Sequence, residues 1–221
     1  WHLQSRILHR METGQYLSEA VDLLEFAHRE ENLACPQSVC TTQDLAVAYG
    51  QRDGKGFVPE RLEAAGETLA RIDPSWQCFE CIVNEYVGAL VDGDRAAEAL
   101  EFLEARTEEI ERTCSPEVAH RRATRFRGAR VSALRALERL EEAFELAQSE
   151  VERLRAEGRD AHQLHHRQLD CARLLARLGR AEEALDYLPD WSTIWNTPKF
   201  YHGAAKAWAH PVEAGALPNT W

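Results

Sequence analysis

Residues 174–188 read LLARLGRAEEALDYL, and this stretch indicates the fold most clearly. Its apolar residues recur at helical spacing up to Leu178, after which Gly179 interrupts the pattern. A second stripe then begins, with the small residues Ala181 and Ala184 on its inner side. The stretch therefore predicts the end of one amphipathic helix, a glycine turn and the start of a second helix packed closely against the first.

The composition favours helices throughout the chain. The 221 residues are rich in Ala, Leu, Glu and Arg and contain only 8 Pro and 12 Gly, few for an all-β protein. No apolar run approaches the roughly 20 residues needed to cross a bilayer, and no export signal is visible. We expect an all-α protein of the cytoplasm, with its six cysteines reduced.

Further helix–turn–helix patterns follow one another along the chain. Five helix pairs are expected: 3–11 with 17–29, 43–51 with 59–72, 74–91 with 96–112, 116–137 with 140–156, and 160–178 with 181–188. Helix starts are predicted at residues 41–44, 73–74 and 115–116, and Gly158 is expected to end its helix in a left-handed conformation. A last helix over 198–209 precedes an irregular tail over 211–221.

One small residue marks the second helix of four pairs. These residues are Ala20, Ala99, Ala143 and Ala184, each followed four positions later by Leu24, Leu103, Ala147 or Leu188. The segments GQYLSEAVDLL, GDRAAEALEFL, RLEEAFELA and GRAEEALDYL carry this pattern. It resembles the tetratricopeptide repeat family, although the repeats here run near 40 to 44 residues where that family has about 34.

The resemblance implies a right-handed α-α superhelix whose concave face is lined by the first helix of each pair. We expect a helical repeat domain over residues 1–210 and an irregular tail over 211–221. Because the sequence begins at Trp1 inside a helical pattern, we interpret it as part of a larger protein. Stretched repeats of this kind resemble those of bacterial regulatory proteins.

Residues 118–137 are strongly basic, with six Arg and no acidic side chain. In the repeat phase set by Ala143, Arg125 and Arg135 point toward the groove, with Ser132 between them. The phase set by Ala184 adds four residues of the next pair. The predicted partner-binding residues are Arg125, Ser132, Arg135, His166, Asp170, Arg173 and Arg177. Guanidinium groups suit a carboxylate or phosphate, so an acidic peptide or protein partner is expected.

The alternative is that these arginines only form ion pairs with Glu138, Glu141, Glu142 or the acidic first half of the chain. A known peptide-carboxylate clamp of some tetratricopeptide proteins needs particular Lys and Asn residues in adjacent repeats. The sequence offers Asn84 and no Lys in register, so that clamp is not expected.

Two clusters have metal-ligand residue types. Cys35, Cys40, Cys78 and Cys81 suggest a four-thiolate zinc site or core cysteines, and we favour the core. His162, His165 and His166 suggest a metal or a polar helix start, and we favour the helix start. No metal or other cofactor is therefore expected.

Aromatic residues gather near the C-terminus, among them Trp191, Trp195 and Trp208. They are interpreted either as a lid over the open end of the array or as an interface for a partner or a second copy. The second interpretation makes a homodimer an alternative.

The predicted function is a non-catalytic scaffold that holds a peptide or protein partner on the concave face. Nucleotide-binding and nucleophile motifs are missing from the sequence, which disfavours an enzyme. The net charge is −11, and residues 1–114 hold 22 acidic and 10 basic side chains, which disfavours nucleic acid. The alternative function is a structural assembly module that self-associates through its aromatic end.

Overall fold

The computed structural model describes residues 38–53, 55–76, 79–158 and 161–188, together with Asp22 and Glu25. Every regular element within these ranges is a helix, and none of them is both long and apolar enough to span a membrane. The chain divides into two compact units, residues 1–129 and 130–221. The predicted helices over 3–11 and 198–209, and the tail over 211–221, lie outside the described ranges.

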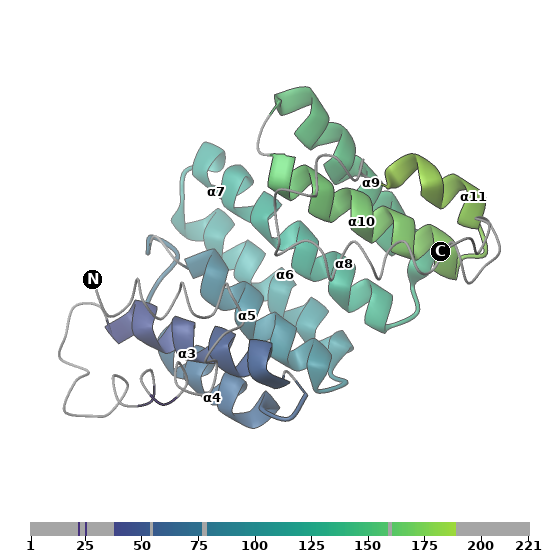
Figure 1. Ribbon diagram of the computed structural model, residues 1–221. Coiled ribbons are helices and arrows are strands. Elements are labelled where there is room, and N and C mark those ends of the chain that lie inside the picture. The colour runs from purple at the N-terminus through teal and green to yellow at the C-terminus, as the bar shows by residue number, and fades with distance from the viewer. Residues whose placement is uncertain are drawn as a thin grey trace. The chain divides into compact units, whose positions relative to one another are not determined.

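From residue 38 onward, the described part of the first unit contains two antiparallel helix pairs and the start of a third (Figure 1). Helix α3 (Ser38–Asp53) packs on α4 (Val58–Leu69), and α4 in turn packs on α5 (Phe79–Asp92). Helix α5 pairs with α6 (Ala96–Thr113). After a short link come α7 (Pro116–Ala123) and the 3₁₀ turn η2 (Thr124–Phe126). Consecutive pairing of neighbours in the chain is the arrangement that the sequence predicts.

The second unit continues the same pattern. Helix α8 (Arg127–Ala136) contains the boundary between the units and is followed by α9 (Leu140–Glu157). Helix α9 lies antiparallel to α10 (Ala161–Arg177), as Figure 1 shows. The short α11 (Ala181–Ala184) and the 3₁₀ turn η3 (Leu185–Tyr187) then pack on α10.

Three of the turns between paired helices have the same backbone conformation and the same hydrogen bond. Asp94, Glu138 and Gly179 each have a positive φ, of 58°, 59° and 76°. The next residue is always an arginine whose backbone N–H donates to the carbonyl of a leucine five positions earlier, at 2.8 to 3.0 Å: Arg95 to Leu90, Arg139 to Leu134, and Arg180 to Leu175. This is the bond pattern that closes a helix through a left-handed residue.

The same arginines also open the next helix. Each guanidinium pairs with the glutamate three positions later at 2.6 to 2.7 Å: Arg95 with Glu98, Arg139 with Glu142, and Arg180 with Glu183. All these side chains are largely exposed, so each pair contributes little to stability. One residue further on, the predicted small positions Ala99, Ala143 and Ala184 have no exposed surface. Ala20 lies outside the described residues.

The predicted start of α3 at residues 41–44 was wrong by one turn, because α3 begins at Ser38. Ser38, Thr41 and Thr42 all have the hydroxyl groups that favour a helix start, so the sequence does not discriminate among them.

The third pair also begins later than predicted, at Phe79 instead of Pro74. Asp73 holds a local turn: its carboxylate accepts from the Ser75 N–H at 2.7 Å, and its carbonyl accepts from the Trp76 N–H at 3.0 Å. These bonds compete with helix formation.

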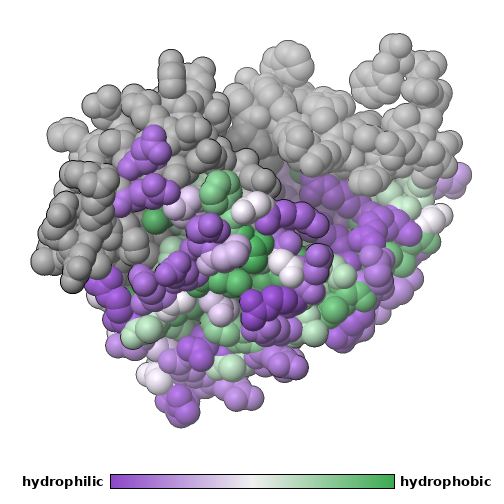
Figure 2. All heavy atoms as spheres, turned by 90° about the horizontal axis from the view of Figure 1, so that it is seen from below, coloured by the Kyte–Doolittle hydropathy of each residue, from purple (hydrophilic) through white to green (hydrophobic). Residues whose placement is uncertain are grey.

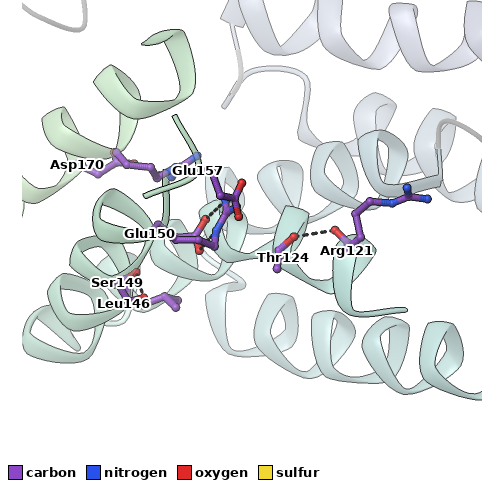
Figure 3. A network of polar contacts seen from close by, with 9 residues as sticks. Arg121, Thr124, Leu146, Ser149, Glu150, Glu157 and Asp170 are labelled. Carbon is purple, nitrogen blue, oxygen red and sulfur yellow. Dashed lines mark hydrogen bonds and ion pairs between the residues drawn. The ribbon is translucent and has the colours of Figure 1, made fainter. Parts of the chain in front are cut away.

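The predicted continuous helix over 116–137 is broken at η2. The Thr124 hydroxyl donates to the Arg121 carbonyl at 2.7 Å (Figure 3), and the Asn84 amide donates to the Arg125 carbonyl at 3.3 Å. Side-chain bonds of this kind offer the backbone an alternative to the regular helix ladder.

The second helix of the last pair is shorter than the predicted 181–188. Leu188 is extended, with ψ at 123°. It precedes Pro189, and a residue before proline disfavours the helical conformation. Gly158 does end α9 in the left-handed conformation, with φ at 61°, as the sequence predicts.

A buried ion cluster joins α3, α4 and α5. Arg61 of α4 is 4% exposed, and its guanidinium donates to Asp92 at 2.5 Å and to Glu85 at 3.0 Å. Gly50 and Gly88 make room for it: a Cβ atom on either would lie 3.2 to 3.3 Å from the guanidinium group. Burial raises the pKa of Glu85 even though Arg61 acts in the opposite direction.

We predict that Ala99→Leu destabilises the protein by about 1–3 kcal/mol, because no space remains around a buried alanine where two helices meet. The exposed neighbour Ala97 provides the matched control. Ala97→Leu is expected to change stability by no more than about 0.5 kcal/mol. Urea unfolding of the two variants checks this, and equal midpoints would contradict the close packing at Ala99.

We also predict that Arg61→Met costs about 3 kcal/mol at neutral pH, because it leaves the Glu85 carboxylate buried without its cation. Loss of Arg61 raises the pKa of Glu85 further, so the cost shrinks at acidic pH, where Glu85 takes up a proton, and grows as the pH rises through that pKa. Asp92 is 39% exposed in its side chain and is solvated without help.

Urea unfolding at several pH values measures this dependence, and Arg112→Met on the exposed side of α6 is the control. Adding Glu85→Gln to Arg61→Met should remove most of the pH dependence. A cost that is the same at every pH would contradict this role of Arg61.

Candidate functional site

The predicted partner-binding residues fall in both units. Arg125 belongs to the first unit, whereas the other six belong to the second: Ser132, Arg135, His166, Asp170, Arg173 and Arg177. The six come from α8 and α10, the first helices of two consecutive pairs. We call these six residues the α8–α10 site.

One ion pair links the last residue of α10 to a residue that follows α8, and it indicates which positions of the two helices lie opposite each other. Arg177, the last residue of α10, donates to both carboxylate oxygens of Glu138 at 2.6 and 2.7 Å, and Glu138 follows α8 by two residues. The two helices run in the same direction, because each is antiparallel to α9. Counting back one helical turn from this contact brings Arg135 opposite Arg173, and a second turn brings Ser132 opposite Asp170.

The electrostatics of Arg173 agree with that register. Burial lowers the pKa of the Arg173 guanidinium, the Asp170 carboxylate opposes this, and the positive charge of Arg135 lowers the pKa further. The charge of Arg135 therefore acts on Arg173, as expected if the two side chains are on the same face. Arg135 has no ion-pair partner among the residues that the structure describes.

Asp170 is the carboxylate that acts on Arg173. It accepts from Arg167 at 2.7 Å and lies 3.8 Å from Arg173. With three arginines around one carboxylate, Arg135, Arg167, Asp170 and Arg173 together have a net charge of +2, which favours an anion.

The remaining predicted residues have different surroundings. Arg177 is engaged by Glu138, which is the ion pairing that the sequence offered as an alternative. Two neighbouring arginines follow the same alternative: Arg180 lies 3.6 Å from Glu141, and Arg139 pairs with Glu142. Ser132 is half-buried, and His166 is exposed on α10.

Arg125 has its contacts in the first unit. Its guanidinium lies 3.9 Å from the Glu80 carboxylate, and its carbonyl accepts from Asn84. Sequence reasoning missed the contact with Glu80, because no local spacing relates residues on α5 and η2. It also missed the buried Arg61, for which the glycines inside two helices were the available signal.

An acidic hollow lies in the first unit. It has a volume of about 300 Å³ and is lined by Glu25, Leu45, Tyr49, Glu60, Glu63, Ala64 and Glu67. The Tyr49 hydroxyl donates to Glu25 at 2.5 Å. The sequence indicates the acidic character of this half but not the hollow.

The two metal-type clusters are only partly described. Cys35 and Cys78 lie outside the described ranges, and Cys81 is exposed on α5. His165 is half-buried on α10. Across the part of the chain that the structure describes, no group of three or more His, Cys, Asp or Glu is placed to hold a metal ion. Trp191, Trp195 and Trp208 lie outside this part.

No family model matches the sequence, and no curated protein matches it. Two solved structures of a kinesin light chain-like protein from Podosopora anserina, with nearly identical TPR-like repeats, are similar in fold. One, a point variant, has a TM-score of 0.58 at 20% identity over 98% of this chain and 96% of that chain. The other has a TM-score of 0.56 at 20% identity over 94% of each chain.

These matches span nearly the whole of both chains, and the helix pairs repeat within each unit as the resemblance predicts. At 20% identity they establish the architecture and not the activity. The chain therefore has an all-α fold of TPR-like helical repeats.

Proposed function

We propose that this protein is a non-catalytic scaffold that holds an acidic segment of a peptide or protein partner at the α8–α10 site. The supporting observation is the pair of like charges at Arg135 and Arg173, on the first helices of consecutive pairs. We place this site in a repeat domain over residues 1–210 of a larger, bacterial regulatory protein in the cytoplasm.

Two neighbouring guanidinium groups are unfavourable unless an anion lies between them. Each cation raises the energy of the other, and burial of Arg173 increases that effect. A packed core residue with no binding role would avoid this arrangement, since a neutral side chain of similar size removes the repulsion. A carboxylate between the two arginines instead gains hydrogen bonds to both forks of donors.

The neighbouring contacts keep the arginine pair in place. The ion pair of Arg177 and Glu138 links the C-terminal ends of α8 and α10, one turn beyond Arg135 and Arg173. Asp170 attracts Arg173 and orients it, while Arg167 provides the remaining positive charge. The site is therefore preorganised, which lowers the entropy cost of binding.

Arg135→Gln tests the proposal through the affinity for a peptide and the free energy of unfolding. If Arg135 had only a structural role, both would fall together. We expect the variant to bind a short peptide of Glu and Ser at least about five-fold more weakly, because one of two guanidinium donors is lost. We expect its free energy of unfolding to be unchanged or raised by up to about 1 kcal/mol, because a repulsion is removed. Fluorescence anisotropy and urea unfolding provide the two measurements.

Arg139→Gln is the matched control in the same unit, since Arg139 pairs with Glu142 on the surface. It should bind the peptide as the unsubstituted protein does. Equal weakening by both substitutions would indicate a general charge effect and would contradict the site. A loss of stability in Arg135→Gln beyond about 1 kcal/mol would assign Arg135 a structural role instead.

A further inference from the structure

The turn before α5 presents an exposed tryptophan beside the basic face of α7. Within the described part of the chain, Trp76 is the large apolar side chain that stays exposed, at 41%. Arg121, Arg122 and Arg125 follow on α7 and η2, and we call Trp76 and these three arginines the Trp76 surface. It belongs wholly to the first unit. Elsewhere, hydrophilic side chains are interspersed with apolar ones over the described part of the face in Figure 2.

Trp76 sits on a fixed turn. Its N–H donates to the Asp73 carbonyl at 3.0 Å, and its own carbonyl accepts from the Phe79 N–H at 3.2 Å. The Asp73 carboxylate accepts from the Ser75 N–H, and the pKa of Asp73 is lowered by hydrogen bonding to the Ser75 side chain and then by this backbone bond. The backbone that carries the Trp76 indole is therefore ordered. This reduces the conformational entropy that is lost when a partner packs against the indole.

Arg122 ties this turn to α7. Its guanidinium donates to the Trp76 carbonyl at 3.2 Å and lies 3.3 Å from a carboxylate oxygen of Glu80. The Glu80 side chain is only 3% exposed. The buried carboxylate therefore fixes Arg122 in place, and through it the position of the turn relative to α7.

Arg121 and Arg125 are exposed, so their guanidinium groups can contact a partner. Arg125 is 57% exposed in its side chain, and its 3.9 Å distance to Glu80 is too long for a hydrogen bond. Arg121 is exposed and forms no ion pair with any described residue. Its side chain points away from Thr124 in Figure 3. Arg121 lies on α7 and Arg125 follows on η2, and the three arginines outnumber the nearby carboxylates of Glu80 and Asp73.

We propose that the Trp76 surface docks an acidic segment of a partner protein, whose carboxylates contact Arg121 and Arg125 while an apolar side chain packs against the indole of Trp76. Tryptophan and arginine are the residues that most often carry the binding energy of protein interfaces. The Glu80 carboxylate within the site and the net charge of −11 oppose a nucleic-acid strand. This surface does not depend on the α8–α10 site.

Two labelled peptides test the docking surface at physiological ionic strength, where weak surface attraction is screened. One contains Glu and Ser only, and the other has the same sequence with a central Leu. Affinities are measured by anisotropy in the Arg135→Gln background, so that binding at the α8–α10 site does not contribute. The indole N–H signal of Trp76, assigned by its loss in Trp76→Ala, reports contact directly.

We expect the Leu peptide to bind more tightly than the Leu-free peptide and to shift the Trp76 indole signal. Trp76→Ala should weaken the Leu peptide by about ten-fold and remove the difference between the peptides. Arg121→Gln should weaken both peptides by about three-fold or more. Arg112→Gln, an exposed arginine of α6 without an ion pair among the described residues, is the control and should change neither.

Three results would overturn the proposal: equal affinities of the Leu peptide for Trp76→Ala and its parent, an unshifted indole signal, or equal weakening by Arg112→Gln. If a single-stranded thymidine oligonucleotide binds more strongly than the Leu peptide and this binding is lost in Trp76→Ala, the partner of the surface is a nucleic acid and not a protein. If only the Trp76 surface is wrong, the Leu-free peptide still binds more weakly to Arg135→Gln than to the unsubstituted protein. If the scaffold function is wrong, the Leu-free peptide binds equally well to both proteins.

Discussion

One turn geometry joins the helices of three described pairs, α5–α6, α8–α9 and α10–α11, and sets how their side chains meet. A residue with positive φ is followed by an arginine whose N–H bonds back to a leucine carbonyl, and this reverses the chain in the same way three times. The turn sets how the second helix meets the first, which is why a fully buried alanine follows four residues after each arginine. A leucine at such a position would separate the helices, because protein interiors are close-packed. The register of the helices, and with it the position of every side chain at the α8–α10 site, follows from this turn.

The fold was predictable because each local signal agreed with the repeat. Apolar spacing, the turn glycine and the recurring alanines all indicate antiparallel pairs, and α6, α9 and α10 lie within two residues of their predicted bounds. The errors arose where side chains bond to the backbone. Asp73 holds a turn in place of a helix start, and Thr124 and Asn84 stabilise a break in a helix that apolar spacing alone makes continuous. Such bonds depend on neighbours in space or on competing local geometry, which periodicity does not report.

The candidate site was predictable only in part. Repeat phase assigned Arg135, Asp170 and Arg173 to one face, and the charge coupling between the two arginines agrees with that phase. Phase did not reveal that Glu138 engages Arg177, or that Arg125 contacts Glu80 on a different helix. Pairing across helices depends on side-chain reach and rotamer, and the sequence limits these only loosely. The same limit explains why the buried Arg61 escaped notice: a charged residue is seldom buried unless distant partners meet it, and here Glu85 and Asp92 lie more than twenty residues away in sequence.

The proposed scaffold function requires that Arg135 and Arg173, whose positive charges repel each other, bind an anion at the α8–α10 site. An NMR titration of the arginine Nε–H signals with acetate and with inorganic phosphate measures this binding. If an anion binds there, the signals of Arg135 and Arg173 move together and saturate, while that of Arg139, engaged with Glu142 on the surface, stays in place. Shifts of equal size at all arginines, or movement of Arg139 without Arg135, would contradict it.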